Sequence, residues 1–420
     1  MFIAMKTPRH RYYGNPKALA WLFFSLFIFF LPLYEAPKNI FSVIFIFFGV
    51  ASIVTQISAL KYFKNADVVC LAFALLVLSP FFAGIGSTVM DVSDRFWSAL
   101  NWALMPLVAL VLLMVNFTAL QLIWSLRIFC IGTIVAIIES FSSWSGWLGS
   151  YPELNSVGHV NQSALYLAFS IIPVGLLLGI RRNLVNMILG VVVVAAVFWY
   201  QGPAKSLVGF AAFVMALGGV WSIYCWTHRY IKTLIGSLAL SLAALLVALT
   251  IPPTYLGYYE HFRSDLQHRW DSEKNPYSYR DRILNSAVEV SGKSLLGFGL
   301  GSFGEATTLQ RIKASVESRG GDWDIEKDRF FSTSHGHNIF ANVLVERGWI
   351  GIMVLSLCLL AFLILFRRAA QSIGAQLGLL TLFLILFAGL GQSTLHVEHG
   401  QLAFICLALC FVIINEADSL

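Results

Sequence analysis

The chain has 420 residues, of which 58% are hydrophobic and only 12% are charged. Soluble globular domains contain about 25% charged residues, so this composition excludes an ordinary soluble domain and predicts an integral membrane protein. The net charge of +6 does not indicate nucleic-acid binding, because no polar face combines basic and aromatic residues. We therefore predict an all-α, polytopic membrane protein.

Apolar runs of about 20 residues, the length of helix that crosses a bilayer, recur along the chain. We predict about twelve transmembrane helices, at residues 18–33, 40–60, 66–82, 99–116, 119–140, 160–180, 184–200, 206–224, 230–252, 339–366, 373–391 and 400–416. The run 339–366 counts as one helix that bends at Gly348. This plan divides the chain into nine membrane helices in 1–252, a loop domain at 253–336, and three membrane helices in 337–420.

Basic residues in the short loops predict the orientation of these helices, because Lys and Arg accumulate on the cytoplasmic side. With a cytoplasmic N-terminus, twelve Lys and Arg residues lie in inner segments, whereas the short outer loops contain only Lys38, Arg95 and Lys205. We therefore expect both termini in the cytoplasm. The polar segment 253–336 follows the ninth helix, so it faces the outside of the membrane.

The segment 253–336 is too long for a passive loop, and we expect a functional, mainly helical domain there. Apolar positions predict a helix over 281–293. Arg280 and Arg282 flank its start about 200° apart, so at most one of them points into a given site. The glycine-rich run 297–304 has no preceding strand and no following Gly-Lys-Ser/Thr, which favours a tight turn against the membrane domain over a phosphate loop.

His335 and His337 lie where the polar segment ends and an apolar helix begins. Neutral imidazole can take up a proton near neutral pH, and the arginines of the same segment are suited to phosphate. We interpret His337 as the candidate general base and His335 as its supporting neighbour. The alternative is that His337 only caps a turn.

A metal site is a second alternative for these histidines, with His396 and His399 as further ligands. No acidic pair completes such a site, and the His-Glu-x-x-His motif is absent. None of the six cysteines lies in the outer segment, so a zinc–cysteine site is not expected there either. We therefore expect neither a metal nor another cofactor.

Four polar residues in or beside the predicted membrane helices are further candidates. Lys205 lies at the outer mouth of the eighth helix, where it either snorkels into the headgroups or serves the site. Arg127 lies within the fifth helix, and either a function or a structural pairing explains an intramembrane charge. Glu139 and His159 lie at outer helix ends, where they either face solvent or contribute to the same cavity.

The pattern as a whole resembles the O-antigen ligase/polymerase superfamily, and within it the lipopolysaccharide O-antigen ligases. One matching block runs from Tyr279-Arg280 to Gly304, and another is His337-Asn338 followed by Glu346, Gly348 and Gly351. The twelve-helix plan with its large loop is the third match. Two departures are Ala204-Lys205, where the family often has Ser-Arg, and Leu284, where it often has an aromatic residue.

The resemblance implies a glycosyltransferase of the Gram-negative inner membrane. Its donor is an O-antigen chain on undecaprenyl diphosphate, and its acceptor is a sugar hydroxyl of lipid A–core at the periplasmic face. His337 is then the general base, and Arg280 and Lys205 stabilise the diphosphate leaving group. We assign Arg282, His335, Asn338 and His159 to substrate binding. The implied reaction inverts the anomeric carbon without a metal.

Three other functions stay open at this stage, and the sequence does not indicate the oligomeric state. A polysaccharide polymerase or a protein-glycosylating ligase of the same superfamily would use the same donor with a different acceptor. A polysaccharide or lipid transporter would show internal repeats and polar residues at the membrane midplane. The candidate residues here instead gather at the outer face.

Overall fold

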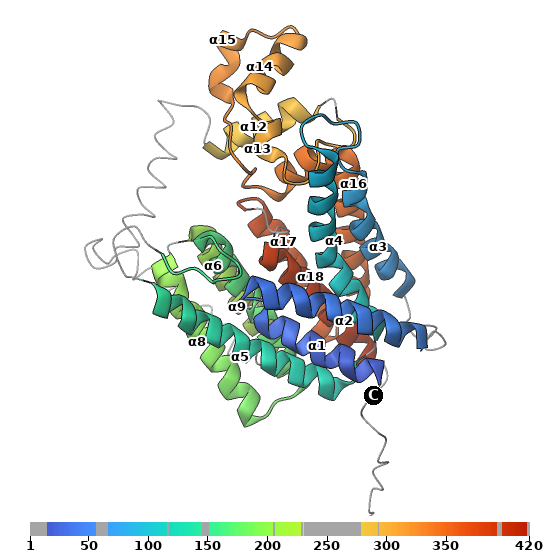
Figure 1. Cartoon of the computed structure of the whole chain (residues 1–420). Helices are drawn as coiled ribbons and strands as arrows, with labels where there is room; N and C mark the ends of the chain where they lie inside the picture. Colours follow the sequence, from blue (N-terminus) through green and yellow to red (C-terminus); the bar gives the residue numbers. More distant parts are fainter. Residues whose placement is uncertain are drawn as a thin grey trace, which may run out of the picture.

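The computed structural model describes residues 15–55, 66–115, 117–144, 151–204, 206–227, 230, 279–292, 294–392 and 397–417. Every regular element in these ranges is a helix (Figure 1). Seven of the described helices are long and apolar enough to cross a membrane, and four shorter helices are also apolar. The prediction of an all-α membrane protein is therefore confirmed in this coarse form.

The apolar helices form the membrane body of the molecule. They are α1 (Pro16–Phe30), α2 (Glu35–Thr55), α3 (Ala66–Phe82), α4 (Val92–Val115), α5 (Ala119–Ser143), α6 (Val160–Phe169), α7 (Ile171–Ile180), α8 (Leu184–Ala204), α9 (Leu207–Thr227), α16 (Ile339–Arg368), α17 (Ile373–Gly389) and α18 (Val397–Ala417). Helices therefore occupy eleven of the predicted runs, and the predicted sixth span is divided into α6 and α7. The predicted ninth span, 230–252, lies outside the described residues except for Tyr230.

The centre of the membrane body is α18, whose residues 401–414 are all buried. This helix packs against α4, α6 and α17. In contrast, α8 exposes Leu184, Val191 and Trp199 to the surroundings. A helix that is apolar on all sides and buried belongs inside a bundle, and an apolar helix with an exposed face suits contact with lipid.

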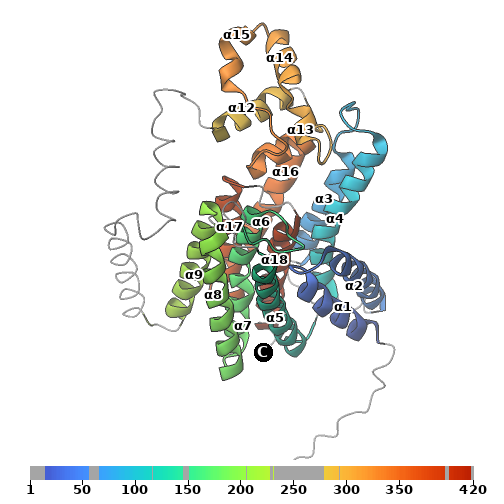
Figure 2. The same cartoon turned by 60° about the vertical axis from the view of Figure 1, so that its left-hand side comes forward.

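The described part of the outer segment forms a small helical lobe beyond one end of the membrane body (Figures 1 and 2). It contains α12 (Tyr279–Ser291), α13 (Phe303–Ala306), α14 (Leu309–Ser318), α15 (Trp323–Glu326) and the 3-10 helix η3 (Lys327–Arg329). We call it the outer lobe. The predicted helix 281–293 corresponds to α12. Residues 253–278 of the predicted loop domain lie outside the described residues, so the extent of that domain stays a prediction.

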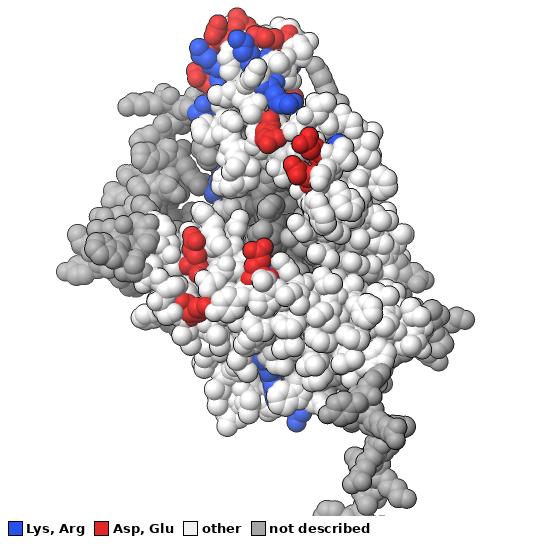
Figure 3. All heavy atoms as spheres, viewed as in Figure 1, with Lys and Arg blue, Asp and Glu red and all other residues white. Residues whose placement is uncertain are grey.

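The outer lobe has its own apolar core, in which Ile283 of α12 and Ile312 of α14 are fully buried. Ala341 and Val345 of α16 belong to the same cluster, so the first turns of α16 hold the lobe on the membrane body. The lobe carries much of the charge visible in Figure 3, while the body below it is mostly uncharged. Arg319 forms ion pairs there with two glutamates, Glu289 and Glu326.

A break in α16 joins the lobe to the body. Gly348 has φ 65° and ψ −163°, which confirms the predicted bend. The backbone N–H of Ile350 donates to the carbonyl of Leu295 (3.2 Å) instead of to its own helix. Two carbonyls beside the break accept from the N–H groups of Phe298 and Gly299, at 2.9 Å each. The glycine-rich turn thus satisfies the backbone groups that the broken helix releases.

The same turn is also bonded to the loop that follows α3 and to a side chain of α16. The N–H of Gly84 donates to Leu296 O (2.9 Å), and a Cβ atom at Gly84 would lie only 2.7 Å from Gly299 N. Glu346 accepts from Gly301 N through its side-chain oxygen Oε1 (3.1 Å). The predicted tight turn against the membrane domain is therefore confirmed, and it lies between α16, α4 and the loop that follows α3.

Candidate functional site

The candidate site is built around the turn that leads into α16. Asn338 caps this helix, because its side-chain oxygen accepts from the N–H groups of Phe340 (2.8 Å) and Ala341 (3.2 Å). The N–H of Gly336 donates to the side-chain oxygen of Asn342 (2.8 Å). These bonds fix the backbone on both sides of His337, so the position of the imidazole is set by the end of the helix.

His337 is the one non-glycine residue in the described ranges with positive φ, at 45°. This left-handed conformation is uncommon for all residues other than glycine, although His, Asn and Asp adopt it more often than the rest. Holding a residue in it costs on the order of 1–3 kcal/mol, and such strain gathers at functional sites. The turn therefore maintains the histidine in a conformation that the chain would not adopt without the surrounding contacts.

The surroundings of His337 keep its imidazole uncharged. Desolvation is the largest effect that lowers its pKa, and repulsion from a protonated His335 and from the Arg280 guanidinium lowers it further. A hydrogen bond with the side chain of Gln392 opposes these effects, and a pKa of about 4 results. At neutral pH the ring of His337 is therefore uncharged, which is the form in which an imidazole accepts a proton.

Arg280, at the start of α12, reaches the chain that follows α17. A Cβ atom at Gly391 would lie 2.9 Å from Arg280 Nη1 and 3.0 Å from a methyl group of Val208. Glycine at 391 thus leaves the space that the guanidinium fills. The side chain of Asn338 donates to the neighbouring carbonyl of Leu390 (3.3 Å). The starts of α9, α12 and α16 and the end of α17 therefore converge on one place.

The two other candidate histidines lie close to this place. The rings of His335 and His337 have centroids 4.1 Å apart, and the hydroxyl of Ser334 lies 2.9 Å from His335 Nδ1. His159 caps α6, where its Nδ1 accepts from Asn161 N (3.2 Å). The neutral form of His159 therefore carries its proton on Nε2. Desolvation and the charge of His159 lower the pKa of His335.

Arg282 lies apart from this group. Its guanidinium donates to Phe330 O (3.0 Å) and lies 5.5 Å from the ring centre of Phe331, inside the outer lobe. Of the two predicted arginines, the structure thus brings Arg280 to His337 and directs Arg282 to the lobe core. Lys205, the third predicted cation, lies outside the described residues.

Two other polar candidates have structural partners away from His337. Arg127 Nε donates to Asn186 Oδ1 (2.8 Å), and its guanidinium lies 4.8 Å from the ring centre of Trp124. The carboxylate of Glu139 accepts a hydrogen bond from the hydroxyl of Tyr34. These contacts agree with the structural pairing weighed for Arg127 and give Glu139 a partner in the short segment between α1 and α2.

Gln392 and Gly391 also lie beside the candidate residues, and the sequence did not predict a role for either. Both residues lie where the last predicted outer loop begins, but many other residues also lie near helix ends, so this position alone does not indicate a function. Within the described ranges, no three His, Cys, Asp or Glu side chains are arranged to hold a metal ion. His396 lies outside those ranges, so this finding does not test the four-histidine alternative.

The arrangement combines a proton acceptor with a fixed positive charge. The uncharged ring of His337 can take a proton from a hydroxyl group, and the nearby guanidinium of Arg280 can stabilise a phosphate oxygen. Arg280 belongs to α12 of the outer lobe and His337 directly precedes α16 of the body, so both residues lie where the polar lobe meets the apolar helices; Figure 1 shows these two helices. Amphiphilic molecules, with a polar head and apolar tail, meet both environments at such a boundary.

Comparison with known proteins does not identify this chain. No protein-family model matches it, and a search of curated protein sequences found no match.

Proposed function

We propose that this protein is a membrane glycosyltransferase that joins O-antigen polysaccharide to lipid A–core. The observation that carries the proposal is the pairing of an uncharged His337 with Arg280 at the boundary between lobe and membrane body. The motifs at 279–304 and 337–351 support the same assignment by their resemblance to O-antigen ligases.

In the proposed reaction, a hydroxyl oxygen of the acceptor sugar attacks the anomeric carbon of the lipid-linked glycan. His337 takes the hydroxyl proton as the new carbon–oxygen bond forms. The old bond breaks, and undecaprenyl diphosphate leaves with its electron pair. Arg280, together with Lys205, stabilises the charge that grows on the leaving diphosphate. Attack from the side opposite the leaving group inverts the anomeric carbon.

The remaining residues have supporting roles in this proposal. His335, His159 and Asn338 line the approach of the sugars, and Gln392 holds the ring of His337 by a hydrogen bond. Arg282, whose guanidinium packs on Phe331, contributes through the outer lobe. No metal takes part in the proposed chemistry, because the diphosphate is a good leaving group once its charge is stabilised.

The proposed membrane arrangement follows from the distribution of basic residues. Twelve helices span the inner membrane of a Gram-negative bacterium, both termini lie in the cytoplasm, and the segment 253–336 lies in the periplasm between helices nine and ten. The site then faces the periplasm. Both lipid substrates would enter it sideways from the membrane.

Deletion of the gene, followed by gel analysis of the lipopolysaccharide, tests the proposal. A ligase deletion leaves lipid A–core without O-antigen, while long polymer persists on the carrier lipid. Caps of a single repeat on lipid A–core would instead identify a polymerase, and unchanged lipopolysaccharide would contradict the proposal. Loss of polymer from the periplasmic face would identify a transporter.

A further inference from the structure

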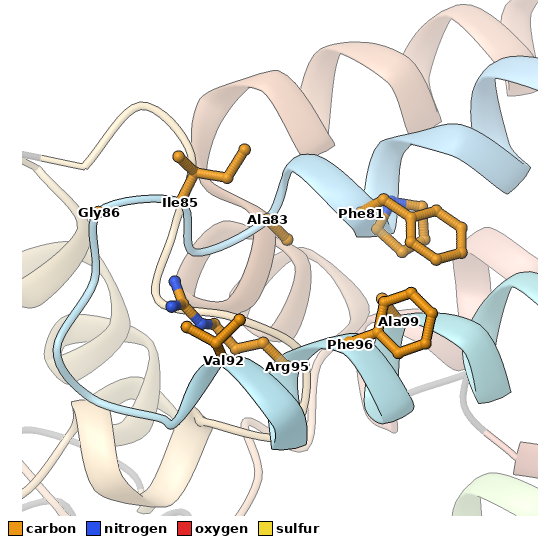
Figure 4. A pocket seen from close by; sticks show the side chains of 9 residues that line it. Phe81, Ala83, Ile85, Gly86, Val92, Arg95, Phe96 and Ala99 are labelled. Atoms are coloured by element: carbon orange, nitrogen blue, oxygen red, sulfur yellow. The ribbon is translucent and has the colours of Figure 1, made fainter.

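A cavity of about 240 Å³ opens between the outer ends of α3 and α4 (Figure 4). We call it the α3–α4 cavity. Phe81 and Ala83 line it from the α3 side, and Arg95, Phe96 and Ala99 line it from α4. Arg95 is the one charged residue in this wall among the residues described. The cavity is thus an apolar space with a single guanidinium at its edge.

The guanidinium of Arg95 has one N–H group in use and another that lacks an acceptor. Its Nη1 donates to the carbonyl of Gly84. Its Nε is buried and has no hydrogen-bond partner among the described residues. A buried donor without an acceptor is costly, more so on a charged group. The rest of the guanidinium lines the cavity, and a bound anion would meet the side chain there.

The mouth of the cavity is aromatic and faces outward. The rings of Phe81 and Phe96 have centroids 6.1 Å apart and lie side by side in Figure 4. Both rings are partly exposed, as is Trp97 beside them. Aromatic residues concentrate where a membrane meets water, so this mouth suits the headgroup level of a bilayer.

An exposed apolar stripe on α3 leads to this mouth. Its residues recur every three or four positions and therefore share one face of the helix: Val68, Leu71, Leu75, Leu78 and Phe82. A hydrocarbon chain lying along this stripe would reach the cavity from the membrane. The stripe and the guanidinium together fit a molecule with an apolar tail and an anionic group.

We propose that the α3–α4 cavity binds a phospholipid of the surrounding membrane. Its phosphate lies against the part of the Arg95 guanidinium that lines the cavity, and one acyl chain runs over the exposed faces of Phe81 and Phe96 onto the stripe. The volume corresponds to roughly eight water molecules at about 30 Å³ each, which admits a headgroup and the start of a chain but not a whole lipid.

The rim of the cavity favours a zwitterionic headgroup with an amine. Asp91 is exposed and lies one helical turn before Arg95, whose N–H donates to the Asp91 carbonyl (3.0 Å). Asp91 directly precedes α4, so its spacing from Arg95 is close to that of helix residues four apart, whose Cβ atoms are about 5–6 Å apart. A carboxylate and a guanidinium at that spacing match the ammonium and phosphate of phosphatidylethanolamine, whereas an anionic headgroup would meet repulsion from Asp91.

Photo-crosslinking of the full-length protein in nanodiscs tests the proposal. The probe is phosphatidylethanolamine with a diazirine on its acyl chain, and mass spectrometry maps the labelled peptides. We expect labelling within 81–99 that falls about tenfold in Arg95→Gln, the loss expected when one charge-assisted hydrogen bond is removed. Arg367→Gln removes an exposed arginine from the far end of α16 and should leave labelling unchanged.

A second variant separates lipid loss from misfolding, because Arg95 also holds Gly84. Ala99→Leu fills the cavity and leaves Arg95 in place, and it should reduce the same labelling. Undiminished labelling in Ala99→Leu or in folded Arg95→Gln would overturn the proposal. So would equal labelling by a diazirine diacylglycerol that lacks the phosphate.

Two competitors identify the ligand. Unlabelled phosphatidylethanolamine should reduce labelling more than phosphatidylglycerol does, and Asp91→Asn should abolish this difference. Stronger competition by phosphatidylglycerol in the native protein would refute the amine headgroup. Inorganic phosphate alone should not compete. If it does, the cavity is a site for free anions and the lipid proposal fails.

Discussion

His337 combines a strained backbone conformation, which costs stability, with an imidazole ring, which the proposed chemistry needs. A residue with a side chain is strained at φ 45°, whereas glycine adopts this conformation without cost. A histidine that only closed the turn would be a poorer choice than glycine. Its presence, with a ring held by Gln392 and left uncharged, fits the proposed role as general base.

The pH dependence of transfer should report the lowered pKa of His337. A general base acts in its unprotonated form, so kcat/KM should stay level as the pH falls through 6.5 and decline only toward about 4. The measurement is the initial rate at limiting donor concentration across this range. A decline centred near 6.5 would mean that the catalytic base is a histidine with an ordinary pKa.

Substitution of Arg280 should affect the rate of transfer, whereas substitution of Arg282 should affect the thermal stability. Arg280→Gln removes the charge beside His337 and should lower kcat by about 10²–10³, the usual effect of deleting one group that stabilises developing negative charge. Arg282→Gln removes the hydrogen bond to Phe330 O and should lower the Tm of the protein instead. Initial rates and thermal unfolding of both variants check this. Equal loss of rate with unchanged Tm in both would contradict it.

At the scale of elements, the break in α16 and the glycine-rich turn form one unit. Each supplies hydrogen-bond partners for the other, and the turn crosses α16 too closely for side chains at either position. A Cβ at Gly348 would lie 2.5 Å from Gly297 N, and a Cβ at Gly297 would lie 2.5 Å from Arg347 N. The same unit carries the turn of His337 at one end and contacts Arg95 at the other.

Gly348→Ala should therefore destabilise the protein strongly, because it adds both a steric clash and a strained φ of 65°. Gly218→Ala is the matched control, since a Cβ there meets no described atom within 4 Å. It should be neutral or stabilise by up to about 1 kcal/mol, the propensity difference in a helix. Thermal unfolding in detergent compares the two. A similar Tm for both variants would disprove the role of the close approach.

At the scale of the whole molecule, the sequence predicted the helices better than it predicted the contacts between them. Apolar runs predicted the helices, and Gly348 with the run 297–304 predicted a bend and a turn, because these follow from local composition. The meeting of His159 and Gln392 with His337 depends on packing between helices far apart in sequence. Hydrophobic periodicity carries no information about such contacts. The φ of His337 was equally invisible, since it results from bonds made by its neighbours.

The pair of arginines marks the limit of prediction from the sequence most clearly. Helical geometry required that Arg280 and Arg282 point in different directions, but it did not say which one faces the histidines. The core of the outer lobe decides this, because Arg282 packs on Phe331 and leaves Arg280 to reach Gly391. The boundary between lobe and body is therefore a product of tertiary packing, and the candidate site lies on it.

The most direct test of the central claim is transfer by purified protein in lipid vesicles, given undecaprenyl-diphosphate-linked O-antigen and lipid A–core. The native protein should form O-antigen-bearing lipid A–core. His337→Gly should keep its Tm, because glycine relieves the strained φ, and should form no product. Product formation by His337→Gly at the native rate, or none by the native protein, would contradict the account.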